Sequence, residues 1–248
     1  GQICGMPAMF LPRHGYGHTI PPHRVNYRAN LWALNYHKAT GVISVASVGG
    51  IRADLNPGDI VIPEQIIDYT WGRQATFFDG NGAPVTHVDF TEPYDPALRQ
   101  RILAAGELLG FGMKTGAVYA ATQGPRLESA AEINRLERDG AHVVGMTGMP
   151  EAVLARELGL PYAAISVVAN HAAEPVVVGG ATVDVDPATG RWRMWYYCRN
   201  RAYERPAPAT LGTGFVALAT SDDGRQWTRV VGPPPHGAVL APSDELDL

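Results

Sequence analysis

The feature that most constrains the fold is an alternation of strand-like and helix-like runs over residues 1–173. KATGVISVASVGGI and LPYAAISVVAN are short apolar runs bounded by turn residues, which is typical of buried strands. Between them lie two stretches with apolar residues at helical spacing, residues 96–109 (PALRQRILAAGELL) and ESAAEINRLERDG. A glycine follows the first stretch and ends the second. Strands that alternate with helices predict an α/β layer fold.

The pattern changes close to Ala173. GGATVDVDPATGRWRMWYYCRN and FVALATSDDGRQWTRVV each read as strand, turn and strand, with Asp-Pro-Ala-Thr-Gly and Asp-Asp-Gly as the turn residues. No helical spacing is visible in this part of the sequence. We therefore predict an α/β domain over residues 1–173 and an all-β meander over residues 174–248.

Composition excludes several classes of function. The 248 residues carry a formal net charge of -4 and no basic tract, which argues against a nucleic-acid partner. No apolar run is long enough to span a bilayer, and no signal-peptide pattern is visible. The two cysteines, Cys4 and Cys198, are far apart and fit a reducing compartment. We expect a cytoplasmic protein without a membrane partner.

One stretch, FLPRHGYGHTIPPHRVNYRAN, holds three arginines, three histidines and no acid. Within it, Arg13 and His14 directly follow the apolar run PAMFLP. A guanidinium is a planar fork that binds phosphate with two hydrogen bonds, and a neighbouring imidazole can donate as well. The alternative is a solvated turn beside a structural histidine. The stretch favours an anion site.

Four more stretches, SVGGI, PGDIVIPEQIIDYTWGR, YAATQGPRLESAAEI and VGMTGMPEAVLARELGLPYA, stand in order after the first. Together they resemble the trimeric purine nucleoside phosphorylase family, in its methylthioadenosine and methylthioinosine phosphorylase branch, over about residues 2–173. The resemblance implies a three-layer mixed sheet with flanking helices, here truncated at its N-terminus. It also implies phosphorolysis of a purine nucleoside to free base and sugar 1-phosphate by a homotrimer. Inorganic phosphate is then the co-substrate, and no metal or organic cofactor is expected.

The resemblance also implies a phosphate site. Arg13 and His14 match the Arg-His pair of the family, and His18 matches a further histidine of the same motif. Thr147, in GMTGMPE, matches a hydroxyl donor to phosphate. Where related enzymes carry a threonine this chain has alanine, so the neighbouring Ser47 is expected to supply the hydroxyl.

A nucleoside site is implied in the same way. Glu128 matches the acid that accepts N1–H of a 6-oxopurine, and Asn170 ends the last strand, where its amide can donate to N7 or O6 of the leaving base. We expect these two residues to be catalytic. Met146 matches the residue against the ribose and Leu127 the position beneath the purine. His87 matches a histidine that reaches the 5′ end of the sugar across a subunit boundary.

Two departures from the family leave three hypotheses open. The chain lacks the initial strand with its Gly-rich turn, and after Asn170 it continues differently: residues 174–248 resemble one or two blades of five-bladed propeller glycosidase-like proteins. The first hypothesis is an active methylthioinosine or methylthioadenosine phosphorylase. The second is a carbohydrate-active or carbohydrate-binding β protein, whose sugar would stack on aromatic residues such as Trp192 and Trp195 unless these fill a blade core. The third is an inactive chimeric or truncated remnant.

Overall fold

The computed structural model describes residues 1–3, 5–80, 82, 84–172, 178–185, 189, 191–198, 215–222 and 228–230. Contacts within the chain divide it into two compact units, Gly1–Ala173 and Glu174–Leu248. The division falls where the composition of the sequence changes. Each unit is described by itself.

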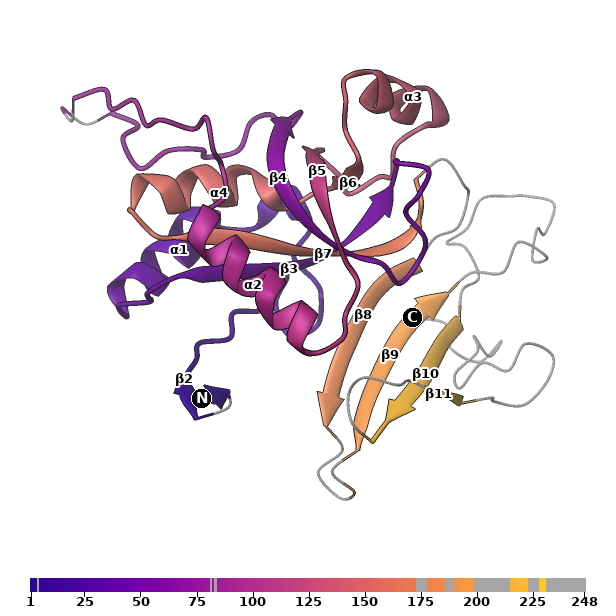
Figure 1. The fold of residues 1–248 in the computed structure, drawn as a ribbon. Coiled ribbons are helices and arrows are strands. Elements are labelled where there is room, and N and C mark those ends of the chain that lie inside the picture. Colours follow the sequence, from indigo (N-terminus) through magenta and orange to yellow (C-terminus); the bar gives the residue numbers. More distant parts are fainter. Residues whose placement is uncertain are drawn as a thin grey trace, which may run out of the picture. The chain divides into compact units, whose positions relative to one another are not determined.

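Five strands form the centre of the first unit (Figure 1). They are β3 (Val42–Gly50), β4 (Ile60–Asp68), β5 (Met113–Ala121), β6 (Val143–Gly145) and β7 (Tyr162–His171). Three pairs of strands are parallel: β3 with β7, β5 with β4, and β5 with β6. Two pairs are antiparallel: β3 with β6, and β4 with β7. The α/β class and the mixed sheet are confirmed. The layered sheet needs a correction, because the strands close into a barrel in the order β3-β6-β5-β4-β7.

Closure depends on β4. Its first residues, Ile60 and Val61, pair with β7, and the strand also pairs with β5 along its length. The register with β5 shifts on both sides of Pro63. A proline cannot donate to the ladder, and such irregularities bend a strand and increase its twist. The stretch GDIVIPEQIIDYT reads in the sequence as a pair of strands, but it forms one strand, with an irregularity at Pro63.

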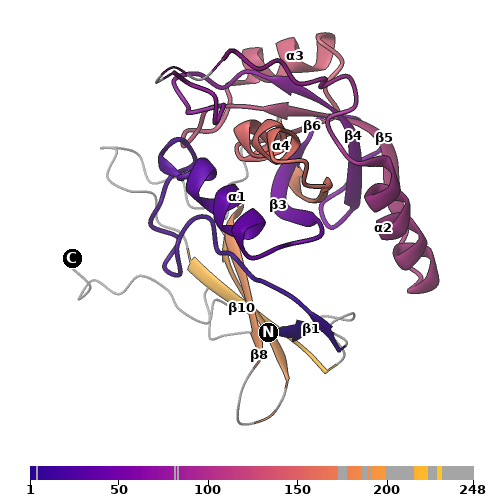
Figure 2. The same ribbon diagram turned by 90° about the vertical axis from the view of Figure 1, so that its left-hand side faces the viewer.

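Four helices pack around the barrel: α1 (Tyr27–Tyr36), α2 (Pro96–Leu108), α3 (Ala130–Arg138) and α4 (Gly148–Glu157). A short 3-10 helix, η1 (Pro22–Arg24), precedes α1, and β1 (Gln2–Ile3) pairs with β2 (Met6–Pro7) near the N-terminus. α1 packs on α4, and α4 contacts β5 and β7 (Figures 1 and 2). α2 also packs on β5 and β7, but at a place away from α1 and α4. Side chains of Asn26, Asp95 and Ser129 cap α1, α2 and α3.

Three apolar clusters follow from this packing. The largest joins Leu31 of α1 and Leu154 of α4 to residues of the strands. Ile133 of α3 belongs to the second, and Ile102 of α2 belongs to the third, with Ile62. α2 and α3 thus bury apolar residues at the helical spacing seen in the sequence. No helix in the described ranges is both long and apolar enough to cross a membrane.

In the second unit the described residues form β8 (Val178–Val185), β9 (Trp192–Cys198), β10 (Phe215–Ser221) and β11 (Thr228–Val230). These strands make an antiparallel sheet in the order β11-β10-β9-β8, so each strand pairs with the next along the chain. The Asp-Pro-Ala-Thr-Gly turn, except Thr189, and the side chains of Trp192 and Trp195 lie outside the described part.

Candidate active site

The half-buried guanidinium of Arg13 joins three distant segments. Its Nη1 donates to Thr147 Oγ1 at 2.9 Å and its Nη2 donates to Ser44 Oγ at 2.7 Å. Its Nε lies 3.1 Å from Oε1 of Glu151 in α4. The predicted partners Arg13 and Thr147 are therefore brought together, whereas Ser44 and Glu151 were not anticipated. Glu151 belongs to the same motif as Thr147, VGMTGMPEAVLARELGLPYA, and that shared motif is the signal that could have identified it.

Glu151 and its neighbours keep Arg13 charged inside the protein. The Arg13 side chain is 13% exposed and that of Glu151 6% exposed. Burial opposes the charged form of Arg13, but the carboxylate of Glu151 acts the other way, and the pKa of Arg13 is raised overall. The second carboxylate oxygen of Glu151 accepts a hydrogen bond from Tyr162 Oη at 2.8 Å. The carboxylate is thus satisfied on both oxygens.

Arg13 retains donors for a ligand. A guanidinium has five N–H groups, one on Nε and two on each Nη. Thr147, Ser44 and Glu151 take one from each nitrogen. Among the described residues no partner takes the remaining N–H of Nη1 and of Nη2, and such a pair can bind two oxygens of one phosphate.

Thr147 is fixed by the turn between β6 and α4. It is buried, and its backbone N–H donates to Tyr119 Oη at 3.4 Å. Glycines flank it closely: a Cβ atom on Gly145 would lie 2.2 Å from Tyr119 Oη, and one on Gly148 would lie 2.8 Å from the same ring. The two glycines of VGMTG therefore let Tyr119 approach the backbone that holds Thr147.

His14, which follows Arg13 in the sequence, lies beside His18, with the two ring centroids 4.6 Å apart. His14 Nδ1 is 2.8 Å from the carbonyl oxygen of Ile20, so Nδ1 carries the proton and donates. Burial lowers the pKa of His14, with smaller contributions from His18 and Arg13. In its neutral form His14 has only Nε2 free, as an acceptor, so it suits a protonated phosphate oxygen rather than a bare anion.

Ser47 is not brought to Arg13. It is exposed on β3, and side chains alternate between the faces of a strand, so Ser44 and Ser47 point to opposite faces. Ser44 is buried and supplies the hydroxyl that Arg13 contacts. The expected contribution of Ser47 to phosphate binding has no support from this placement.

The segment after β5 carries the predicted purine residues. Thr122 Oγ1 donates to Oε1 of Glu128 at 2.6 Å, which orients a half-buried carboxylate. Leu127 is 54% exposed. Ser129 then caps α3 through a capping box with Glu132. Glu128 is thus held between the end of a strand and a capped helix, with one carboxylate oxygen left without a described protein partner.

The strand register brings the segment that carries Glu128 close to the turn that carries Thr147. Ala121 of β5 pairs with Gly145 of β6, and Thr122 N donates to the Gly145 carbonyl at 2.8 Å. On the other side of β6, Gly49 of β3 pairs with Val144 and with Asn170 of β7. Asn170 therefore ends its strand at this rim of the barrel, where its Nδ2 donates to the His171 carbonyl at 2.9 Å.

Met146 lies between the segment that carries Glu128 and the turn that carries Thr147. Gly124, which has a φ of +60°, packs so closely that a Cβ atom there would lie 2.4 Å from Met146 Sδ. Met146 thus contacts the purine-side segment while it directly precedes Thr147. His87, in contrast, is exposed in the segment before α2, and no described contact joins it to these residues.

Arg73 is a site residue that sequence reasoning did not assign. It belongs to the TWGR motif after β4, and its half-buried guanidinium donates to backbone carbonyls of Thr122, Gln123 and Met146. The motif contains this arginine, but its partners are backbone carbonyls of distant loops, and no sequence pattern identifies these.

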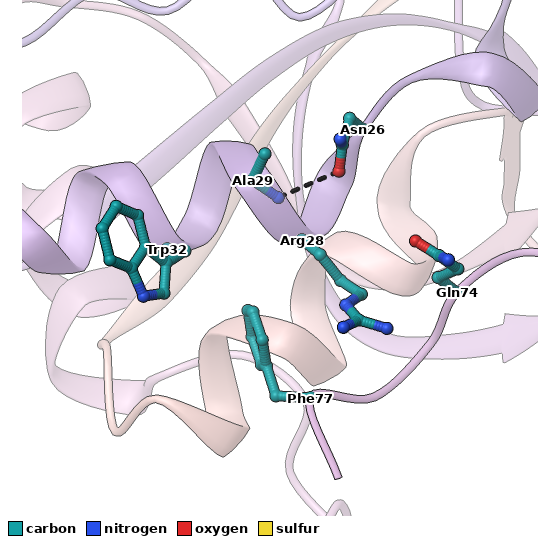
Figure 3. Close-up of a pocket in the computed structure, with 6 residues that line it drawn as sticks. All are labelled: Asn26, Arg28, Ala29, Trp32, Gln74 and Phe77. Atoms are coloured by element: carbon teal, nitrogen blue, oxygen red, sulfur yellow. Dashed lines mark hydrogen bonds between the residues drawn. The ribbon is translucent and has the colours of Figure 1, made fainter. Parts of the chain in front are cut away.

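A surface pocket of about 320 Å³ lies elsewhere on the first unit (Figure 3). Arg28 and Trp32 of α1 line it with Phe77 and Gln74, and the Arg28 guanidinium is 5.9 Å from the centre of the Phe77 ring. The pocket shares no lining residue with the Arg13 cluster. In the described ranges no group of three or more histidine, cysteine or acidic side chains is arranged to hold a metal ion.

Comparison with known proteins places this geometry in a family. The model of the Phosphorylase superfamily matches residues 2–188. The chain is 53% identical over 173 residues to a probable S-methyl-5'-thioinosine phosphorylase of Xanthomonas campestris pv. campestris, covering 70% of this chain and 69% of that protein. It is 48% identical over 178 residues to the 6-oxopurine nucleoside phosphorylase of Pyrococcus furiosus, covering 70% and 67%.

A solved structure gives the same result. The methylthioadenosine phosphorylase of Schistosoma mansoni in complex with tubercidin superposes with a TM-score of 0.62 at 34% identity, covering 65% of this chain and 64% of that one. The chain thus spans about two thirds of the length of these relatives. The sequence match, the fold and the motif residues around Arg13 agree: the chain belongs to the phosphorylase superfamily.

Proposed function

We propose that the protein is a purine nucleoside phosphorylase that releases the purine from S-methyl-5'-thioinosine, or from methylthioadenosine, and forms the sugar 1-phosphate. The observation that carries the proposal is the Arg13 guanidinium, which keeps two N–H donors beside Thr147. Thr147 follows β6, and the end of β6 pairs with the end of β5, the strand that leads to Thr122 and Glu128. The names of relatives that are about half identical to the chain support it.

In this reaction a phosphate oxygen attacks the anomeric carbon. The bond from that carbon to purine N9 breaks, its electron pair leaves with the base, and a proton is taken up at the purine. Arg13 and Thr147 hold the phosphate close to the sugar, which replaces an encounter in solution by a positioned attack. Asn170 and Glu128 bind the purine and stabilise the charge that develops on it. Inorganic phosphate is the co-substrate, and no step needs a metal or organic cofactor.

The base preference rests on Asn170 and Glu128. An ionised Glu128 accepts the N1–H of a 6-oxopurine, and the Asn170 amide donates to N7 or O6. A 6-aminopurine lacks N1–H, so it would leave Glu128 without that donor. This favours methylthioinosine over methylthioadenosine as the substrate.

A homotrimer in the cytoplasm is part of the proposal. His87 is exposed in the single chain, as expected for a residue that completes the site of a neighbouring copy. A mixture of His87→Ala and Arg13→Ala chains, refolded together, then contains some sites with both residues intact and regains activity over either variant alone. A monomer in sedimentation analysis, or no regain on mixing, counts against the trimer.

For residues 174–248 we propose a propeller-like fragment. The sequential antiparallel order β11-β10-β9-β8 supports it, because a propeller blade is a four-stranded antiparallel sheet. A carbohydrate-binding role for this unit predicts that the full chain binds oligosaccharides without phosphate in calorimetry. Absence of such binding leaves the phosphorylase function unaffected and removes the sugar-binding alternative.

The deciding experiment measures hypoxanthine release from methylthioinosine by the purified chain, with and without phosphate. Release that requires phosphate supports the proposal. A folded chain that releases no base under either condition is the inactive remnant instead.

A further inference from the structure

We infer that Arg73 is a positioning residue that sets the spacing between the purine side and the phosphate side of the site. This inference rests on the proposed function. The purine side means Thr122 to Glu128, and the phosphate side means Met146 to Met149. Arg73 belongs to neither segment, and it contacts both.

On the purine side, Arg73 holds the turn that leads to Glu128. Its Nη2 donates to the carbonyl oxygens of Thr122, at 3.2 Å, and of Gln123, at 2.8 Å. Its Nε donates to the Gln123 side chain at 3.1 Å. Thr122 in turn orients Glu128 through its hydroxyl group. A shift of Arg73 would therefore move the backbone that aims the purine carboxylate.

On the phosphate side, Arg73 binds on both sides of Thr147. Its Nη1 donates to the carbonyl oxygens of Met146, at 2.8 Å, and of Met149, at 2.6 Å. Met149 has non-helical dihedral angles, with φ −121° and ψ 140°, at the kinked start of α4. These two bonds bracket the residue whose hydroxyl group meets Arg13.

The electrostatics of Arg73 suit this role. No carboxylate lies within ion-pair distance of it among the described residues, and burial lowers its pKa. The groups that it contacts are neutral: backbone carbonyls, the Gln123 amide, and Tyr27, whose hydroxyl group lies 3.3 Å from Nη1 and whose ring centre lies 5.6 Å from the guanidinium. The charge of Asp68 acts at longer range and opposes the lowering of the pKa. Arginine places five donors in one rigid plane, whereas lysine places three on a flexible stem. Only the planar fork can hold both segments at a fixed separation.

Phosphorolysis makes that separation important. The nucleophile and the leaving base must lie on opposite sides of one carbon, and a displacement of about 1 Å from a distant change can lower the rate about 100-fold. Because Arg73 would touch neither substrate, its loss should disturb both half-sites at once and leave each side's own ligands in place.

The test compares Arg73→Lys with Arg99→Lys. Arg99 is a matched control, since its half-buried guanidinium also donates to a backbone carbonyl, that of Pro63 at 2.9 Å, and to Glu64. We expect kcat/KM for methylthioinosine to fall about 100-fold in Arg73→Lys, with higher KM for both phosphate and nucleoside, and little change in Arg99→Lys. Free guanidinium ion, kept well below unfolding concentrations, should restore part of the rate to Arg73→Ala.

Three outcomes overturn the inference: an unchanged kcat/KM in folded Arg73→Lys, a change in the KM of one substrate alone, or the same loss in Arg99→Lys. If the parent protein itself shows no phosphate-dependent release, the proposed function fails, and hydrogen exchange then decides on Arg73. Faster exchange of backbone amides in both residues 122–124 and 145–149 of Arg73→Lys supports the positioning role. Unchanged exchange in either segment refutes it.

Discussion

Arg13 and Glu151 form a buried ion pair, in which Nε of Arg13 lies 3.1 Å from Oε1 of Glu151. Arg13 precedes the first barrel strand, β3, and Glu151 lies in α4, the helix that follows β6. The pair orients the guanidinium so that its two outer nitrogens meet Ser44 and Thr147. The proposed phosphate site thus rests on a guanidinium that Glu151 orients and keeps charged.

Replacing Arg13 by alanine should weaken phosphate binding more than nucleoside binding. We expect the KM for phosphate to rise about 10- to 100-fold, the loss of one or two charged hydrogen bonds. Initial-rate kinetics with each substrate varied in turn measures both constants. Arg24→Ala is the control, because Arg24 lies exposed in the same cation-rich stretch. Equal changes in the two KM values would contradict the assignment of Arg13 to phosphate.

Glu151→Gln should destabilise the protein. Removing one charge of a buried pair leaves the other uncompensated and typically lowers the free energy of unfolding by about 3–5 kcal/mol. Urea denaturation followed by fluorescence gives this value. Glu64→Gln removes the carboxylate from a pair whose acid is 44% exposed, with Arg99, and should have a much smaller effect. Similar losses in both variants would show that burial of the Arg13 pair is unimportant.

Gly124→Ala should raise the KM for nucleoside. The new Cβ would lie 2.4 Å from Met146 Sδ, so the purine-side turn and Met146 must separate. Gly159→Ala is a matched control, because Gly159 has a similar φ of +66° but its new Cβ would meet no heavy atom within 4 Å. Both variants share backbone strain of about 1–2 kcal/mol. Only Gly124→Ala should affect binding, and equal KM values in the two would remove Met146 from the nucleoside site.

Asn170→Asp should shift the preference toward 6-aminopurines. A carboxylate accepts a hydrogen bond from the amino group, whereas it cannot donate to O6. The ratio of kcat/KM for methylthioadenosine to that for methylthioinosine should rise about 5-fold or more, equivalent to one hydrogen bond of about 1 kcal/mol. Asn134→Asp on the exposed face of α3 serves as control. An unchanged ratio would separate Asn170 from base recognition.

Protonation of His142 should destabilise the fold in acid. Its Nδ1 accepts a hydrogen bond from Val118 N–H at 2.9 Å, which requires the neutral ring. Burial, with a smaller contribution from Arg52, lowers the pKa of His142 below 6.5. The unfolded chain therefore takes up the proton first, so stability falls as pH drops through 6.5 toward the folded-state pKa.

His142→Asn tests this directly, because its side-chain oxygen can accept from Val118 without titrating. Urea denaturation at about pH 7.5 and about pH 5.5 should show a smaller acid loss of stability in the variant than in the parent. His14 also has a lowered pKa, so the variant keeps part of the dependence of stability on pH. An identical slope in parent and variant would exclude His142 as a contributor.

The sequence by itself determined the α/β class and the helices α2 and α3, because both follow from the spacing of apolar residues over a few turns or strand positions. It also showed the cation-rich stretch, and the family resemblance carried by its long motifs implied that Arg13 and Thr147 share one site. The tertiary structure alone decided that Ser44, and not Ser47, meets Arg13, because this depends on which face of β3 turns inward.

Closure of the barrel and the role of Arg73 also needed the tertiary structure. β4 bends at Pro63 and pairs with two strands that lie far from each other in the sequence. The acceptors around Arg73 are mostly backbone carbonyls, a group that every residue carries and that only the folded chain selects. The spacing of apolar residues can be read directly from the sequence. The register across strands and the direction of a carbonyl group arise only when the whole unit packs.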